Sequence, residues 1–187
     1  MSILKIKKYP DPVLRKKCEE VKEITKEIKV FSRNMIETMT ESEGIALAAP
    51  QVGELKRVIV VHPIRDRSLK ARAETNPQAF INPKIIRKSK EAKIDEEGCL
   101  SFPGLFLKIK RAKKVVVEAL TQEGKKIQIK AEGLPARVFQ HEIDHLDGIL
   151  FIDKISFRQR LKIRKKLKTE LPKEAKVEKK TKSSLTD

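Results

Sequence analysis

A series of short β-rich segments through the middle of the chain limits the folds that this sequence can adopt. The segments are rich in Val, Ile and Leu, and apolar and polar side chains alternate most clearly over 125–131. Successive segments follow one another too directly for the crossover helices that parallel strands require. The sequence therefore predicts antiparallel strands and an α+β fold class. The predicted strands are 57–62, 80–86, 105–109, 113–120 and 125–131.

Three helices are expected beside these strands. Apolar residues at spacings of three and four predict an amphipathic helix over 24–39. A second helix is expected over 135–147, with a proline in its first turn and Gly148 after its end. A third, basic helix is expected over 157–171. The predicted fold is therefore a set of mostly antiparallel β-sheets around a central helix, with an N-terminal helix and a basic C-terminal helix.

The remaining segments are predicted to connect these elements. Glycine and proline residues indicate a loop or an irregular edge strand over 44–53, and 121–124 is predicted to be the tight turn of a hairpin. Charged residues without periodicity indicate an exposed loop over 65–77. The Lys-rich residues after 171 are expected to be disordered.

Length and charge indicate one catalytic domain with a basic extension. A chain of 187 residues can bury a core without disulfide bonds, and we expect a catalytic domain over 1–155 and a basic helix and tail over 156–187. Residues 154–187 contain 13 Lys or Arg and 4 Asp or Glu, so they hold +9 of the formal net charge of +17. Such a tail either binds polyanions such as rRNA or is simply a solvated surface.

Nothing in the sequence predicts export or membrane insertion. The longest apolar runs are far shorter than the roughly 20 residues that span a bilayer, and the N-terminus lacks the apolar stretch of a signal peptide. We therefore expect a cytoplasmic protein with no membrane partner. In a reducing compartment Cys18 and Cys99 are not expected to form a disulfide, and Cys18 is interpreted as a structural residue.

The sequence HEIDH at 141–145 predicts a metal site. Two histidines four residues apart lie on one face of a helix, so His141 and His145 can bind one ion. Glu142 lies beside them and can take a proton from a water molecule that the ion activates. The alternative is an HExxH motif that occurs by chance on a solvent-facing helix. The mixture of polar and apolar residues around the motif favours a helix packed against a sheet.

A third protein ligand is needed, and it leaves the fourth position open for water. Phe151 stands where one class of peptidases has its third histidine, and the later glutamates lie in the Lys-rich tail. His62 lies at a predicted strand end, where a partly exposed structural role is more common. Cys99 is the remaining strong candidate, because its thiolate would complete a Cys/His/His/water tetrahedron. The alternative for Cys99 is a buried, unreactive thiol.

Three motifs resemble those of the peptide deformylases in their order and separation. They are GIALAAPQ at 44–51, EGCLS at 97–101 and QHEIDH at 140–145, and the opening YPDPVLR at 9–15 is similar as well. The resemblance covers residues 3–155. It implies removal of the N-formyl group from nascent formyl-methionyl polypeptides, with release of formate.

The resemblance also implies the composition of the metal site. Cys99, His141 and His145 would bind one divalent metal ion, which is typically Fe²⁺ in this family and is replaceable by Ni²⁺, Co²⁺ or Zn²⁺. Glu142 would be the general acid and base.

Further residues are expected to act on the substrate. By resemblance, Gln51 and the backbone N–H of Leu100 would donate hydrogen bonds to the oxyanion, although Gln51 by itself indicates only a turn residue. Leu134 and Val138, with Phe139 beside them, would line an apolar pocket for the methionine side chain. The alternative for these three residues is ordinary packing in the core.

The peptide backbone is expected to pair with the edge that begins at Gly44. Two residues, one in this segment and one after the Cys99 motif, differ from the usual pattern of the family. Ala46 stands where a second glycine is usual, and Phe106 stands in place of a basic residue that contacts the substrate in many relatives. An ion pair between Glu97 and Arg111 would hold the Cys99 segment, and the alternative is that either residue is simply a surface charge.

Two other functions remain open from the sequence. A ribosome-associated binding protein without turnover would account for Ala46, Phe106 and the basic tail. A metallopeptidase, or an amidase acting on another acyl group, would account for the HExxH motif. An active deformylase accounts for more of the residues, and its C-terminal helix over 157–171 would contact rRNA phosphates at the ribosome.

Overall fold

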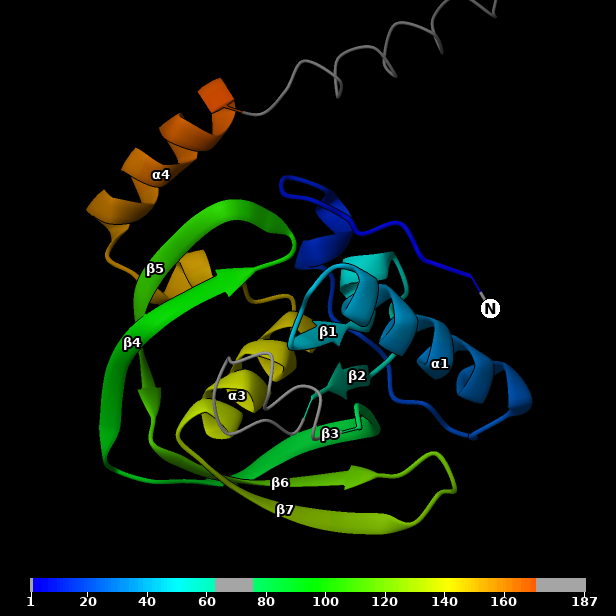
Figure 1. Ribbon diagram of the computed structural model, residues 1–187. Helices are drawn as coiled ribbons and strands as arrows, with labels where there is room; N and C mark the ends of the chain where they lie inside the picture. The colour runs from blue at the N-terminus through cyan, green and yellow to red at the C-terminus, as the bar shows by residue number, and fades with distance from the viewer. Residues whose placement is uncertain (1, 63–75, 171–187) are drawn as a thin grey trace, which may run out of the picture. The chain divides into compact units, whose positions relative to one another are not determined.

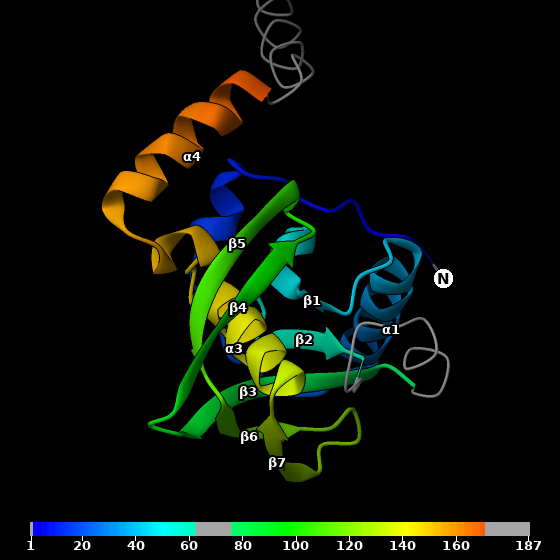
Figure 2. The ribbon, with the colours of Figure 1, turned by 60° about the vertical axis from the view of Figure 1, so that its left-hand side comes forward.

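The computed structural model describes residues 2–62 and 76–170. Contacts within the chain define two units, Met1–Lys154 and Ile155–Asp187. The first unit contains all strands of the described residues (Figures 1 and 2). No helix in these residues is long and apolar enough to span a lipid bilayer.

The strands of the first unit form two antiparallel sheets, which confirms the predicted α+β class. The larger sheet has the strand order β1-β2-β3-β6-β7, so β1 lies at one edge, and β4 and β5 form a separate two-stranded sheet. Figure 1 shows this second sheet as a long curved hairpin in green. The strands are β1 (Ala46–Ala48), β2 (Val58–Val61), β3 (Gln78–Lys88), β4 (Ala92–Cys99), β5 (Phe102–Ala112), β6 (Lys114–Leu120) and β7 (Lys126–Glu132).

Strand β4 is the one strand of the described residues that the sequence does not predict. Its sequence, AKIDEEGC, is rich in charge, and its first five residues are all exposed, so no apolar alternation marks it. Pairing with β5 stabilises it instead. The other predicted strands are present, although β5 is much longer than the predicted 105–109 because it follows β4 along its length.

Helix α3 (Leu134–Leu146) is the central helix that the sequence predicts. It contacts β1, β2, β3 and β7 of the larger sheet and β5 of the smaller one, and Figure 2 shows it between the two sheets. The helix is followed by Gly148, whose φ of 71° lies in the left-handed region that glycine adopts most easily. Apolar side chains of α3 form one core cluster with the facing side of the larger sheet.

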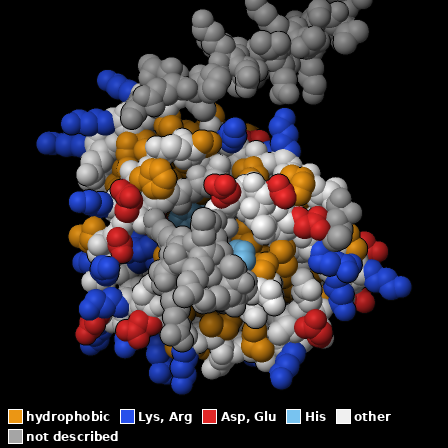
Figure 3. Space-filling view, viewed as in Figure 1, with side chains coloured by type: hydrophobic (Ala, Val, Ile, Leu, Met, Phe, Trp, Pro, Cys, Tyr) orange, Lys and Arg blue, Asp and Glu red, His pale blue; other side chains and the backbone are white. Residues whose placement is uncertain are grey.

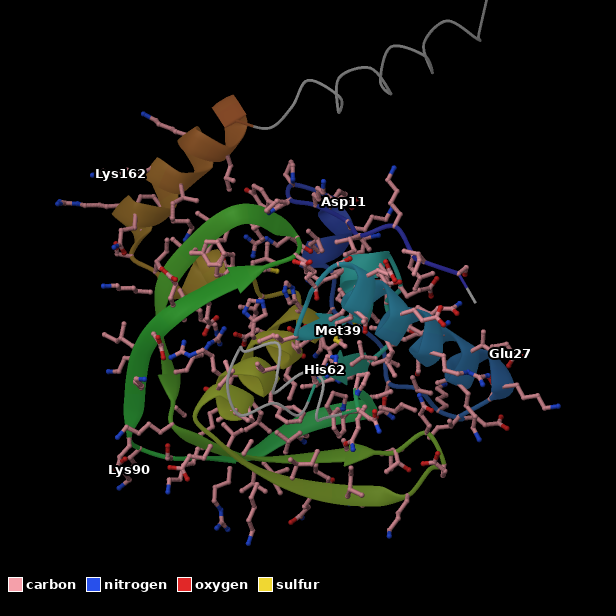
Figure 4. The ribbon with its side chains drawn as sticks, viewed as in Figure 1. Asp11, Glu27, Met39, His62, Lys90 and Lys162 are labelled. Atoms are coloured by element: carbon pink, nitrogen blue, oxygen red, sulfur yellow. The ribbon has the colours of Figure 1, made fainter. Side chains whose placement is uncertain are left out.

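Helix α1 (Lys26–Glu41) covers the opposite face of the larger sheet, close to the predicted 24–39. Because side chains alternate along a strand, Val58 and Val60 of β2 pack in the α1 cluster, while Ile59 and Val61 pack in the α3 cluster. Figure 4 shows Met39 at the inner end of α1 and Glu27 at its outer end.

Two residues near these cores were candidates for special roles. His62 follows β2 and is buried, so the expectation of a partly exposed side chain is wrong. All residues of β2 are buried, and His62 lies in the interior because it directly follows this strand. Cys18 is also buried, and both cysteines are free.

The connections agree with the sequence where they are described. The β6–β7 turn is tight, because Thr121 N–H donates to Lys125 O at 2.9 Å and Gly124 N–H donates to Thr121 O at 3.0 Å. The segment 44–53 contains the short edge strand β1 and the 3₁₀ turn η2 (Ala49–Val52). The predicted loop 65–77 lies outside the described residues except for 76 and 77. Two further 3₁₀ turns are η1 (Pro12–Arg15) and η3 (Phe151–Lys154).

The second unit contains helix α4 (Phe157–Glu170), which matches the predicted basic helix. The expectation of disorder after 171 falls outside the described residues.

Candidate active site

Cys99, His141 and His145 lie together although 46 residues separate the first from the last. Cys99 ends β4, and the two histidines lie one turn apart on α3. Their potential ligand atoms all lie within 4.8 Å of one another, and Cys99 Sγ is 3.3 Å from His145 Nε2. Ligand atoms around a tetrahedral ion are separated by about 3.5 Å, so this cluster is of the right size to hold one. One thiolate with two imidazoles suits a borderline-soft divalent ion.

Glu142 lies between the two histidines in the sequence and is buried beside them. Its Oε2 atom accepts no hydrogen bond from any described residue. Burial raises the pKa of Glu142 to about 7, against the opposing charge of His141. A carboxylate with this pKa can both accept and release a proton near neutral pH.

Gln51 is fixed in one orientation at the same cluster. Its Oε1 atom accepts a hydrogen bond from the backbone N–H of Ala48 at 2.8 Å. Its Nε2 atom therefore faces Cys99 Sγ at 3.4 Å and Ser101 Oγ at 3.3 Å. The turn residue that the sequence alone suggests is thus also a hydrogen-bond donor beside the potential metal ligands.

Glu97 is only 3% exposed and is surrounded by positive groups. Arg111 binds both of its carboxylate oxygens, at 2.9 and 3.0 Å, and Arg137 Nη1 lies 2.6 Å from Oε1. Glu97 Oε2 lies 3.0 Å from His141 Nδ1. Because a carboxylate can only accept, the proton of His141 is on Nδ1, and Nε2 is left for the site. Although burial opposes it, the hydrogen bonds from His141 and Arg111 lower the pKa of Glu97 far below its usual range.

The two histidines differ in their tendency to carry charge. Burial opposes charge on His141, but hydrogen bonds to Cys99 and Glu97 raise its pKa well above the usual value. Burial, with the charge of His141, lowers the pKa of His145 well below it. A divalent ion binds the deprotonated forms of such groups, so binding and protonation compete at this cluster.

A cavity of about 460 Å³ lies beside these residues. The four residues expected to contact substrate all line it; they are Gly44, Ala46, Leu134 and Val138. Leu100, Cys99, His141 and Glu142 also line the cavity. Figure 3 shows pale-blue histidine atoms beside orange hydrophobic side chains near the middle of the view, where Figure 4 labels His62.

Two glycines at the cavity allow close contacts between segments. A Cβ atom at Gly44 would lie 2.8 Å from Leu100 Cδ1, so glycine lets the entry to β1 touch the Cys99 segment. A Cβ atom at Gly98 would lie 2.6 Å from the ring of Phe106. The Phe106 ring therefore lies close to the backbone of β4 at Gly98, and it remains 57% exposed at the cavity.

Some expectations for the cavity need correction or refinement. Phe139 does not line it but packs edge-on against Phe80 in the core, with ring centres 5.3 Å apart. Ala46 adopts the extended backbone of β1, so its methyl group causes no backbone strain. Glu97 and Arg111 are not surface charges, since they form a buried ion pair.

Arg137 is the main residue of the site that the sequence reasoning missed. It lies one turn before His141 on the same face of α3, and it lines the cavity. Arginine on a helix is usually solvated, which hides such a role. The signal was its position, four residues before a potential ligand.

Comparisons with known proteins place these motifs in one family. The model of the polypeptide deformylase family matches residues 3–161. The chain is 52% identical to the peptide deformylase of Thermodesulfovibrio yellowstonii, over 87% of this chain and 98% of that protein. The crystal structure of peptide deformylase from Thermotoga maritima is similar with a TM-score of 0.75 and 41% identity, over 83% of this chain and 99% of that one. The peptide deformylase of Ehrlichia chaffeensis in complex with actinonin has a TM-score of 0.81 and 39% identity, over 91% and 99% of the two chains.

Proposed function

Because the chain belongs to the polypeptide deformylase family, metal-dependent hydrolases that remove the N-formyl group from nascent polypeptides, we propose that Cys99, His141 and His145 bind its metal ion. The observation that supports this ligand set is the meeting of their three potential ligand atoms within 4.8 Å, beside a cavity of substrate size. The ion is proposed to be Fe²⁺, with Zn²⁺, Ni²⁺ or Co²⁺ able to replace it, since one sulfur and two nitrogen ligands suit all four.

Glu142 is proposed to move the protons of the reaction. A divalent ion held by these ligands would supply a Lewis acid and lower the pKa of water at the site. Glu142 accepts the proton of the attacking water and returns it to the amine that leaves. Its burial, its free Oε2 atom and its pKa of about 7 support this role.

Gln51 and the backbone N–H of Leu100 are proposed to stabilise the oxyanion that forms when water attacks the formyl carbon. Ala48 fixes the carbonyl end of the Gln51 amide, so the Nε2 donor is already oriented before the substrate binds. Such pre-orientation is what makes a donor effective in the transition state.

The substrate is proposed to bind along the cavity with its methionine side chain against Leu134 and Val138. Among the described residues β1 pairs with β2 alone, so its other edge can accept the extended peptide backbone as an added strand. Gly44 and Ala46 line the cavity at this edge. Recognition through the backbone would accept many sequences after the methionine, as a general processing enzyme requires.

The first test is release of formate from formyl-Met-Ala-Ser by protein purified without oxygen and loaded with Fe²⁺ or Ni²⁺. Glu142→Ala is expected to lower kcat by about 10²–10⁴-fold with unchanged metal content. Glu132→Ala is the matched control, because Glu132 lies on β7 in an exposed ion pair with Lys114. Full activity of Glu142→Ala would contradict the assignment of the proton transfer.

We also propose that the basic C-terminal residues bind rRNA phosphates, so that the enzyme acts on chains as they leave the ribosome in the cytoplasm. The excess of +9 over 154–187 and the helix α4 support this proposal. A ribosome-binding protein without turnover is the alternative, and the absence of formate release from folded, metal-loaded protein would favour it.

A further inference from the structure

Arg137 connects three elements, and two of them carry the candidate metal ligands. It is 6% exposed and projects from α3. Its Nη1 atom donates to Glu97 Oε1 at 2.6 Å and to the backbone carbonyl of Ile109, on β5, at 2.9 Å. Its Nη2 atom donates to the backbone carbonyl of Lys93, on β4, at 2.9 Å. One guanidinium group thus ties the helix to both strands of the smaller sheet.

Through Glu97, Arg137 acts on both kinds of potential ligand, the thiolate and an imidazole. Glu97 lies two residues before Cys99 on β4, so a shift of Glu97 moves the thiolate. The same carboxylate lies 3.0 Å from His141 Nδ1, so a shift of Glu97 also turns that imidazole. On α3, Arg137 lies four residues before His141 and eight before His145, which puts all three on one face of the helix.

Arg111 joins the same three elements but through different contacts. It binds Glu97 from β5 and also binds Asp144, on α3. The backbone carbonyl of Lys93, on β4, is bound by Arg137. The planar guanidinium can reach a carboxylate and backbone carbonyls at once, which the single ammonium group of lysine cannot do in the same geometry.

We infer that Arg137 is a positioning residue that sets the distance and orientation between the Cys99 thiolate and the two histidines. This inference rests on the proposed function, since it concerns the same metal ligands. Groups that orient ligands in this way typically change metal affinity by about 10–100-fold when they are removed.

The test compares Arg137→Lys and Arg137→Met with Arg57→Lys as the matched control. Arg57 is also nearly buried, pairs with Asp147 just after α3 at 2.7 Å and donates to the Pro83 carbonyl at 3.2 Å. It therefore has the same kind of contacts without touching Glu97. Each protein is stripped of metal and titrated with Co²⁺, and the thiolate-to-cobalt absorption band is recorded together with the melting temperature.

We expect Arg137→Lys to fold, to raise the Kd for Co²⁺ by about 10–100-fold and to change the charge-transfer band. Arg137→Met should raise the Kd at least as much, and Arg57→Lys should leave the Kd and the band unchanged. A lower melting temperature of the Arg137 variants with an unchanged Kd and band would overturn the inference, because Arg137 would then only stabilise the fold. Failure of both variants to fold would overturn it in the same way.

The same experiment separates this inference from the ligand assignment. The proposed ligand set is wrong if the wild-type protein shows no thiolate-to-cobalt band. It is also wrong if the wild-type band is still present in Cys99→Ser. If that band is present and the Arg137 variants bind Co²⁺ as tightly as the wild type, only the positioning role is wrong.

Discussion

Glu97 is a buried carboxylate that contacts two guanidinium groups, those of Arg111 and Arg137. The three buried charges stabilise one another, so the loss of one leaves the others uncompensated. Replacing it by glutamine leaves Arg111 and Arg137 buried without their shared counter-charge. Removing one member of a buried ion pair costs about 3–5 kcal/mol. We therefore expect Glu97→Gln to lower the free energy of unfolding by about this amount, as measured by urea denaturation. The matched control is Glu132→Gln, which removes an exposed pair and should change stability by less than about 1 kcal/mol. Equal stability of the two variants would contradict the buried network.

Cys18, unlike the charged Glu97, is a buried thiol that burial keeps neutral. Burial raises its pKa from 9.0 to about 11, against the opposing charge of Arg57. At pH 8 a thiol reagent should therefore modify only Cys99 in folded, metal-free protein, and Cys18 should react once urea unfolds the chain. The unfolded chain loses the Cys18 proton at lower pH than the folded chain. Stability should thus fall as the pH rises from 9.0 toward about 11, and Cys18→Ala should lack this component. Two equally fast thiols at pH 8 would contradict the prediction.

Individual residues differed in how well the sequence predicted their place in the site. His141 and His145 follow from helical spacing alone, and Cys99 follows from the need for a third ligand. Arg137 could not be predicted, because nothing local distinguishes a buried arginine from a solvated one. Its partners are a carboxylate 40 positions away and strand carbonyls that only the folded chain brings near.

The elements show a similar contrast between local and distant causes. The amphipathic pattern of α1 and the alternation in β7 are local, and both elements were predicted close to their observed ends. Strand β4 has no such pattern, since its stability comes from pairing with β5. The missed strand bears on the proposed function because its last residue, Cys99, is a proposed metal ligand.

The end of α3 offers a test of how tightly the ligand-bearing helix is held. Gly148 has φ of 71°, and a Cβ atom there would lie 2.5 Å from the carbonyl oxygen of Arg15. Gly104 has a nearly identical φ of 72°, yet a Cβ atom there would meet nothing within 4 Å. Gly104→Ala should therefore cost only the backbone strain of about 1–2 kcal/mol. Gly148→Ala should cost clearly more, because η1 must also move. Equal urea midpoints for the two variants would show that the contact with Arg15 adjusts without cost.

At the scale of the whole molecule, the candidate site is assembled from segments that are far apart in the sequence. Gln51, Cys99 and His145 come from η2, β4 and α3, and all belong to the unit Met1–Lys154. About half of the net positive charge, in contrast, lies after that unit, since residues 155–187 contain 12 Lys or Arg and 4 Asp or Glu and so hold +8 of the +17. This division separates the residues proposed for chemistry from those proposed for ribosome binding.

A chain that ends at Ile155 should therefore keep its catalytic constants but lose affinity for ribosomes. On formyl-Met-Ala-Ser we expect unchanged kcat and KM, because every residue that lines the described cavity lies before 155. Binding of the full chain to ribosomes should weaken steeply with salt, since Lys and Arg release counterions from phosphates. Removing 156–187 should lower the affinity at low salt and flatten the plot of log K against log salt concentration. If the shortened chain binds ribosomes with the same affinity and the same slope, the contact lies in the first unit instead. If the shortened chain folds but turns over more slowly, α4 contributes to catalysis as well.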